Sequence, residues 1–252
     1  MAPRRVEQRE IPTDTESETK ANGHKPASLI ATLVDLRSRQ IQKARIQFGN
    51  RTSAIERGAD EASDSQEEIV RFYLGAFADL ETQITSHITK LVKAKPIYKR
   101  ASKVKGVGPM MAAYLIAFID IEKADTVSAL WRYAGYGVVN GEREKPVKGE
   151  KLHYNARLKT GMYLLAGQFL KANSPYARVY EEAKPKYALA HPDWTKLHCH
   201  LAAQRKMIKL FLSHLWEVWR KQEGLSVVAP WAFSNPEWAQ AHRHIPPEDF
   251  GW

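Results

Sequence analysis

A glycine-framed turn lies directly before an apolar helix in the stretch KGVGPMMAAYLIAF, from Lys105 to Phe118, and it leaves this part of the chain few ways to fold. Glycine permits positive φ angles and close backbone approach, and Pro109 suits the first position of a helix. A helix ending near Lys105, the turn Gly106-Val107-Gly108 and a second helix from Pro109 form a helix-hairpin-helix pattern. A tight turn whose glycines serve geometry alone is the other interpretation.

Cationic side chains crowd the approach to this turn, and no acidic residue occurs among them. The first N–H groups of a helix lack intrahelical partners and lie at the positive end of its dipole, so they suit a phosphate group. The whole chain has 38 Lys and Arg against 28 Asp and Glu, a formal net charge of +10, which favours polyanionic partners. The cations before the turn are Lys90, Lys93, Lys95, Lys99, Arg100, Lys103 and Lys105.

A second basic set follows in GEREKPVKGEKLHYNARLKTG, around a predicted β-hairpin with Asn140-Gly141 at its turn. Contact with phosphates or stacked bases is the functional interpretation of this set, and a solvated hairpin is the alternative. Contacts to phosphate carry no base information, so binding at the turn should be largely independent of sequence. The predicted nucleic-acid-binding residues are Lys99, Arg100, Lys103, Lys105, Gly106, Val107, Gly108, Met110, Arg143, Lys145, Lys148, Lys151, Tyr154, Asn155, Arg157 and Lys159.

The first third of the chain combines a polar tail with two apolar stripes. Residues 1–25 contain almost no large apolar side chains and are predicted to be disordered. Apolar residues then recur at spacings of three and four, first from Ser28 towards Gly58 and again after Ser65, which is the expected N-cap of the second helix. The stripes predict either an antiparallel hairpin within the chain or a coiled coil between protomers.

The remaining chain is also predicted to be helical. Pro185 is expected to break or kink one helix, and the Trp- and Pro-rich end is expected to form an irregular strap held by its aromatic side chains. The predicted fold class is therefore mainly α: a helical hairpin or coiled coil, a helix-hairpin-helix, and a small helical domain with one short β-hairpin. The predicted parts are the disordered tail 1–25, the helical segment 26–95, the helix-hairpin-helix domain 96–222 with later helices near 155–172, 174–189 and 194–222, and the strap 223–252.

The order of several motifs resembles the C-terminal transposase domain of the insertion-sequence 110/116/902 family, from about Leu80 to Arg220. The motifs are VKGVGPMMAAYLIAFI, a segment ending in WRYAGY, a glycine-bearing hairpin, YNARLKTGMYLLAG and LAAQRKMIKLFLSHLWEVWR. The resemblance implies a DNA-binding protein, with structured RNA as another partner, because members of the family work as ribonucleoproteins. It also implies a homo-oligomer that pairs through residues 28–95.

Two departures separate this chain from the family. The family's N-terminal RuvC-like domain is replaced by the predicted tail and two helices. The family's nucleophilic serine lies in the hairpin, whereas the corresponding Gly137–Glu150 contains no Ser, Thr, Tyr or Cys, so no covalent DNA intermediate can form there. We expect no catalytic residue and a protein that binds nucleic acid without recombining it alone. The alternatives are an active or partner-dependent transposase or recombinase, an RNA-binding ribonucleoprotein component, and an oligomeric assembly protein.

Neither a metal site nor a cofactor is expected. His198, Cys199 and His200 are adjacent on a predicted helix, where their side chains point in different directions and cannot converge on one ion. A single cysteine cannot form an internal disulfide, and no apolar run is long enough to cross a membrane. We therefore expect a cytoplasmic protein that associates with nucleic acid and has no membrane partner.

Overall fold

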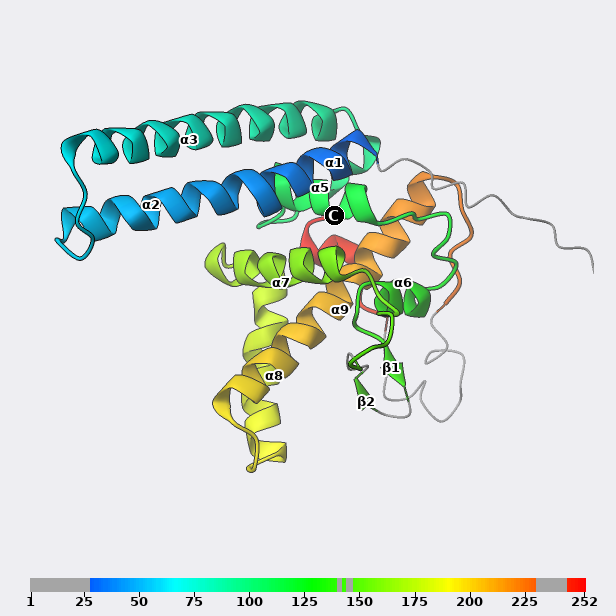
Figure 1. Cartoon of the computed structure of the whole chain (residues 1–252). Helices are drawn as coiled ribbons and strands as arrows, with labels where there is room; N and C mark the ends of the chain where they lie inside the picture. Colours follow the sequence, from blue (N-terminus) through cyan, green and yellow to red (C-terminus); the bar gives the residue numbers. More distant parts are fainter. Residues whose placement is uncertain (1–27, 140–141, 144–146, 230–243) are drawn as a thin grey trace, which may run out of the picture.

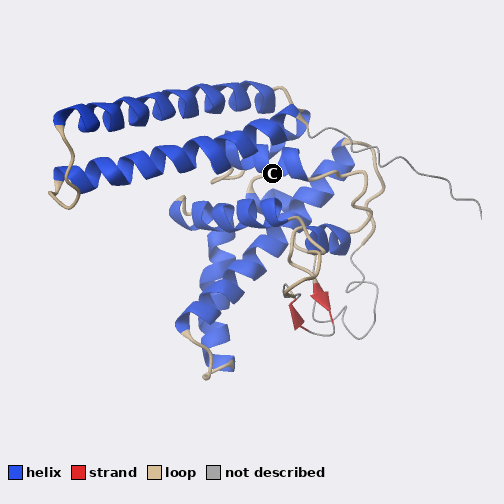
Figure 2. Cartoon of the chain, viewed as in Figure 1, coloured by secondary structure: helices blue, strands red, loops and turns tan. Residues whose placement is uncertain are grey.

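Helices account for most of the regular structure, and the predicted mainly α fold is confirmed (Figures 1 and 2). The computed structural model describes residues 28–139, 142–143, 147–229 and 244–252, so the predicted tail and the Asn140-Gly141 turn lie outside the described residues. The helical elements are α1 (Leu29–Asp35), the π-helical η1 (Leu36–Ile41), α2 (Gln42–Glu56), α3 (Asp64–Lys93), α4 (Pro96–Ala101), α5 (Pro109–Phe118), α6 (Val127–Tyr133), α7 (Ala156–Lys171), α8 (Pro175–Ala190), α9 (Lys196–Gln222) and the 3-10 turn η2 (Pro247–Phe250).

An arm of two antiparallel helical segments extends from one side of the molecule (Figure 1). One segment runs through α1, η1 and α2, and the other is α3, so the chain adopts the hairpin rather than requiring a partner to pair these segments. The carboxylate of Glu81 on α3 joins them by accepting from Arg37 at 2.7 Å and Arg45 at 2.6 Å. The N-cap of α3 is Ser63, not Ser65, and its N–H donates to the side chain of Gln66 at 3.0 Å.

The apolar stripe of α3 is buried to different degrees along the helix. Ile84 and Ile88 are buried in the core, whereas Ile69 and Tyr73 from the same predicted stripe remain 56% and 45% exposed. The hairpin therefore leaves apolar side chains exposed in the N-terminal half of α3.

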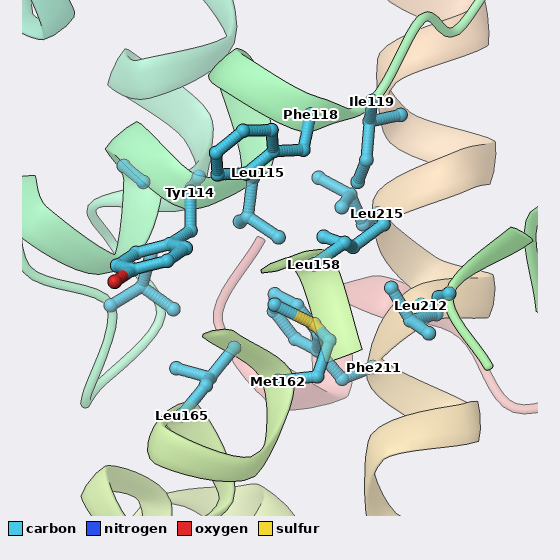
Figure 3. Close-up of a cluster of buried hydrophobic side chains, with 14 of the residues drawn as sticks. Tyr114, Leu115, Phe118, Ile119, Leu158, Met162, Leu165, Phe211, Leu212 and Leu215 are labelled. Carbon is cyan, nitrogen blue, oxygen red and sulfur yellow. The ribbon is translucent and has the colours of Figure 1, made fainter. Parts of the chain in front are cut away.

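The core lies where α5, α7 and α9 meet (Figure 3). Every residue of α5 is apolar, because this helix packs on α1, α3 and α7 at once. The helices α5 and α7 approach closely at Gly161, where an added Cβ would lie 2.7 Å from the ring of Tyr114. The largest buried side chains of this core include Leu115, Leu158, Met162, Leu165, Phe211 and Trp216.

The long helix α9 anchors the loops around it. Arg220 is 4% exposed and donates to the carbonyl oxygens of Ile121 and Ala124 at 3.0 Å each, so it secures the connection between α5 and α6. A break or a kink is predicted at Pro185; α8 is continuous through Pro185, which excludes the break, and its buried face packs along α9. No helix among the described residues has the length and apolar composition to cross a membrane.

Two-residue strands β1 (Val138–Val139) and β2 (Glu142–Arg143) pair antiparallel beyond α6. Their base is held by α9, because the guanidinium of Arg205 donates to the carbonyl oxygens of Tyr136 at 2.6 Å and Gly137 at 2.8 Å. These hydrogen bonds attach the start of the hairpin to α9.

Candidate nucleic-acid interface

The helix that leads into the glycine turn, α4, ends earlier than predicted from the sequence. The predicted end near Lys105 is wrong, since α4 ends at Ala101 and an irregular segment continues to Gly108. The side chains of Val104 and Val107 are 1% and 3% exposed, and the N–H of Val107 donates to the carbonyl of Val104 at 2.9 Å. These buried valines hold the turn against the core.

Gly106 is required by the fold itself. Its φ of +102° lies in the region that side chains rarely adopt, and an added Cβ would lie 2.9 Å from the ring of Phe169 on α7. This part of the turn faces the protein interior, so Gly106 and Val107 position the neighbouring backbone and leave the contact with any ligand to Gly108 and the start of α5.

Gly108 is exposed, and an added Cβ would meet no atom within 4 Å. It is the N-cap of α5, with φ −80° and ψ 175°, and no side chain among the described residues caps this helix end. Pro109 has no N–H, and the first intrahelical bond joins the N–H of Ala112 to the carbonyl of Gly108 at 3.0 Å. The N–H groups of Met110 and Met111 therefore have no intrahelical acceptor and lie at the positive end of the helix dipole.

Exposed cations precede this helix end in the sequence. Lys99, Arg100, Lys103 and Lys105 are all exposed, and none of them forms an ion pair with any described residue. Four arginines of the arm differ, because Arg37, Arg45, Arg51 and Arg71 form ion pairs with carboxylates of the same arm. No acidic residue occurs in the sequence between Glu81 and Asp120. Positive charge without a protein partner therefore concentrates at the turn.

The C-terminal segment approaches the same region from the other side. A Cβ on Gly251 would lie 3.6 Å from the carbonyl oxygen of Lys103, and the preceding turn η2 contains the exposed Glu248 and Asp249. No ion pair joins either carboxylate to Lys103 in the described part of the chain.

Several members of the predicted second basic set are engaged within the protein. The side-chain oxygen of Asn155 caps α7 by accepting from the N–H groups of Arg157 and Leu158 at 3.0 Å each, and its amide nitrogen donates to the hydroxyl of Tyr133 at 2.8 Å. Arg157 forms an ion pair with Asp35 at 3.0 Å. These contacts show that Asn155 and Arg157 support the fold.

The other members of this set have different environments. The Lys159 ammonium lies 4.2 Å from the centre of the Tyr154 ring, so one face of this ring is already covered. Lys148 and Lys151 are exposed. The backbone of Arg143 belongs to β2, and Lys145 lies outside the described residues.

A further cationic group, absent from the sequence prediction, lies where α9 passes α6. Lys209 is half-buried, with its ammonium 3.9 Å from the centre of the Trp131 ring, and Arg205 lies one helical turn earlier. Burial, together with the positive charge of Arg205, lowers the pKa of Lys209 to about 8. The spacing of four residues on one helix was the available sequence signal, but it does not reveal burial.

The histidines near the α8–α9 connection contact aromatic rings. The rings of His191 and His198 each stack on the ring of Trp194, with centroid separations of 4.0 Å and 3.9 Å. Cys199 is buried. The ring of His200 hydrogen-bonds to the hydroxyl of Tyr180 at 2.7 Å. Within the described ranges, no group of three or more His, Cys, Asp or Glu side chains could hold a metal ion.

Comparison with protein-family models, with curated proteins and with solved structures finds no match to this chain. The resemblance to insertion-sequence transposases thus depends on the sequence motifs alone and stays a prediction. What the chain can bind must be argued from the geometry and charge of its own surface.

Proposed function

We propose that this protein binds the phosphate backbone of nucleic acid, with double-stranded DNA as its primary partner. The binding surface consists of the N-terminal end of α5 and the four exposed cations Lys99, Arg100, Lys103 and Lys105. A phosphate oxygen accepts from the free N–H groups of Met110 and Met111, while the cations neutralise the flanking phosphates.

The observation that carries this proposal is that the cations at the turn lack carboxylate partners among the described residues, whereas several cations of the arm have them. Four arginines of the arm, Arg37, Arg45, Arg51 and Arg71, have carboxylate partners. The four cations at the turn have none among the described residues, and the sequence has no acidic residue between Glu81 and Asp120. Like charges held close together repel one another, and a polyanion removes this repulsion as it binds. A helix end without a capping side chain at the same place supplies hydrogen-bond donors for the same ligand.

Contacts of this kind predict strong dependence on salt and little dependence on base sequence. If these four cations contact duplex phosphates, the logarithm of the binding constant should fall with the logarithm of salt concentration with a slope of roughly −3 to −4. The segment that corresponds to the nucleophile hairpin of the transposase family offers no hydroxyl or thiol. The proposed role is therefore binding without strand cleavage by this chain alone.

The decisive experiment is the substitution Gly108→Asp. The backbone of Gly108 already has the extended conformation of an N-cap, and the new side chain would meet no atom within 4 Å. Aspartate at an N-cap accepts from the free N–H groups and typically stabilises a helix by about a few tenths of a kcal/mol relative to glycine. The variant should unfold at the same or a higher temperature and yet bind duplex DNA at least tenfold more weakly.

The matched control is Thr126→Asp at the N-cap of α6. Thr126 caps α6 by accepting from the N–H of Ala129 at 3.1 Å, so aspartate preserves the cap and adds the same charge to the chain. Fluorescence anisotropy with a labelled duplex should show a smaller loss of affinity for the control than for Gly108→Asp. Equal losses would show that net charge alone matters, and unchanged binding in both variants would exclude the turn as the interface.

The type of nucleic acid is tested by competition. Unlabelled duplex DNA, branched DNA, structured RNA and single strands compete for the same labelled duplex at one salt concentration. We expect duplex or branched DNA to compete best, because the rigid array of phosphates matches cations fixed on a folded turn. Stronger competition by structured RNA would assign the surface to a ribonucleoprotein instead.

Self-association is a second proposed property, and exposed apolar side chains on α3 support it. Ile69 and Phe72 are 56% and 68% exposed, and their spacing of three residues places them on one side of the helix. We propose that two copies cover these side chains by pairing their arms. Light scattering should give a dimer mass that Phe72→Glu reduces to a monomer, with Gln83→Glu on the same helix as the charge control. A monomer at high concentration would contradict this pairing.

A further inference from the structure

A second cationic site lies at the base of the β1–β2 hairpin, away from the α4–α5 turn. Arg205 and Lys209 are four residues apart on α9, where their side chains share one face of the helix. The guanidinium of Arg205 lies 5.6 Å from the centre of the Tyr136 ring, and the ammonium of Lys209 lies 3.9 Å from that of Trp131. Arg132, on α6, is exposed beside the same segment, and Gly137 packs against it.

We propose that the surface where α6 contacts α9 binds a phosphate group of the nucleic-acid backbone, with Lys209 as its principal contact. This inference depends on the proposed function and adds a binding site that is separate from the glycine turn. The site would hold bound nucleic acid close to the hairpin with its predicted basic residues.

The arrangement of Lys209 favours an anion over a purely structural role. No carboxylate pairs with Lys209 in the described part of the chain, and its charge lies near that of Arg205 in a partly desolvated position. Two like charges at this spacing destabilise a helix, and partial burial increases the cost. A phosphate at Lys209 would offset the repulsion between the two cations, because it offers opposite charge and several hydrogen-bond acceptors.

The fold keeps this cationic site in place without a ligand. The indole N–H of Trp131 donates to the backbone carbonyl of Lys209 at 2.9 Å, which ties α6 to α9. The guanidinium of Arg205 is oriented by its bonds to the carbonyls of Tyr136 and Gly137. A preformed site of this kind needs little rearrangement to bind a phosphate.

The test measures both binding and the charge state of Lys209. The full chain is reductively methylated with ¹³C, which preserves lysine charge, and the Lys209 resonance is assigned by its loss in Lys209→Gln. Saturation with a short random-sequence duplex should raise the pKa of Lys209 from about 8 towards the value of an ordinary lysine. Lys209→Gln should weaken duplex binding about fivefold to tenfold at 0.1 M salt and make the salt slope less steep by about one.

Lys221→Gln on the same helix is the matched control, because Lys221 already pairs with Glu217 at 2.6 Å. An unchanged pKa of Lys209 in the saturated complex, or equal binding by the two glutamine variants, would overturn the inference. A pKa that rises with inorganic pyrophosphate but not with duplex would also overturn the nucleic-acid assignment. If Gly108→Asp abolishes binding while Lys209→Gln has no effect, only the second site is excluded. The opposite result would exclude the turn and retain this site.

Discussion

Lowering the pH should destabilise this protein through a single buried histidine. His214, on α9, is 1% exposed, and its two ring nitrogens contact the hydroxyl of Tyr176 at 2.6 Å and the carbonyl of Ile245 at 3.0 Å. The indole N–H of Trp252 donates to the Tyr176 oxygen at 2.7 Å, so the tyrosine O–H can donate to Nδ1 of His214. This assignment requires a neutral imidazole whose Nε2–H donates to Ile245.

The free energy involved can be estimated from the pKa of His214. Burial is the main reason that this pKa falls from 6.5 to about 4, and the contact with the Ile245 carbonyl only partly opposes the change. A difference of about 2.5 in pKa corresponds to about 3 kcal/mol. Because the folded state disfavours the charged form, the contribution is fully present above pH 6.5 and is lost as the pH falls towards 4.

The assay is urea denaturation, followed by tryptophan fluorescence at several pH values between 7.5 and 4. In His214→Gln, the side chain cannot titrate but still carries a donor and an acceptor. The stability advantage of the unsubstituted protein over this variant should shrink by about 3 kcal/mol across the pH range. Replacement of the exposed His87 by Gln serves as the control. Parallel stability curves for the unsubstituted protein and His214→Gln would refute the role assigned to His214.

Three other perturbations separate the fold from the interface. In urea denaturation, Gly106→Ala should destabilise the protein by about 1–3 kcal/mol, and Gly108→Ala should change its stability by less than about 0.5 kcal/mol. The reason is that only Gly106 has a positive φ and a close contact with a ring. Equal effects of the two substitutions would contradict this packing. Glu81→Gln should lower the free energy of unfolding by about 1–3 kcal/mol, because Arg37 and Arg45 lose their shared carboxylate. An unchanged melting temperature would show that these two ion pairs add nothing to stability. Replacing Lys103 and Lys105 together by Gln should make the salt slope of duplex binding less steep by about two, and an unaltered slope would remove both from the interface.

Features that depend on neighbouring residues were predictable from the sequence. The start of α5 at Pro109 follows from the proline and the glycine before it, and the bounds of α7, α8 and α9 agree with their apolar periodicity to within about two residues. Local signals do not separate two equivalent capping candidates. Ser63 has Gln66 and Ser65 has Glu68 three residues further on, and in the structure Ser63 caps α3.

Features that depend on distant contacts were not predictable in the same way. The end of α4 at Ala101 reflects the burial of Val104 and Val107 against other helices. Likewise, basic residues are visible in the sequence, but only the fold shows that Arg157 pairs with Asp35 on α1 whereas Lys103 has no described carboxylate partner.

The sequence by itself therefore determined that this chain is helical, basic, and turned by glycine and proline before an apolar helix. These properties depend on composition and on spacings of three and four residues. Only the tertiary structure decided which apolar side chains of α3 remain exposed, which glycine faces the interior, and that Lys209 lies beside Trp131 and Arg205. Burial and charge pairing arise between residues far apart in the chain, so no local pattern can specify them.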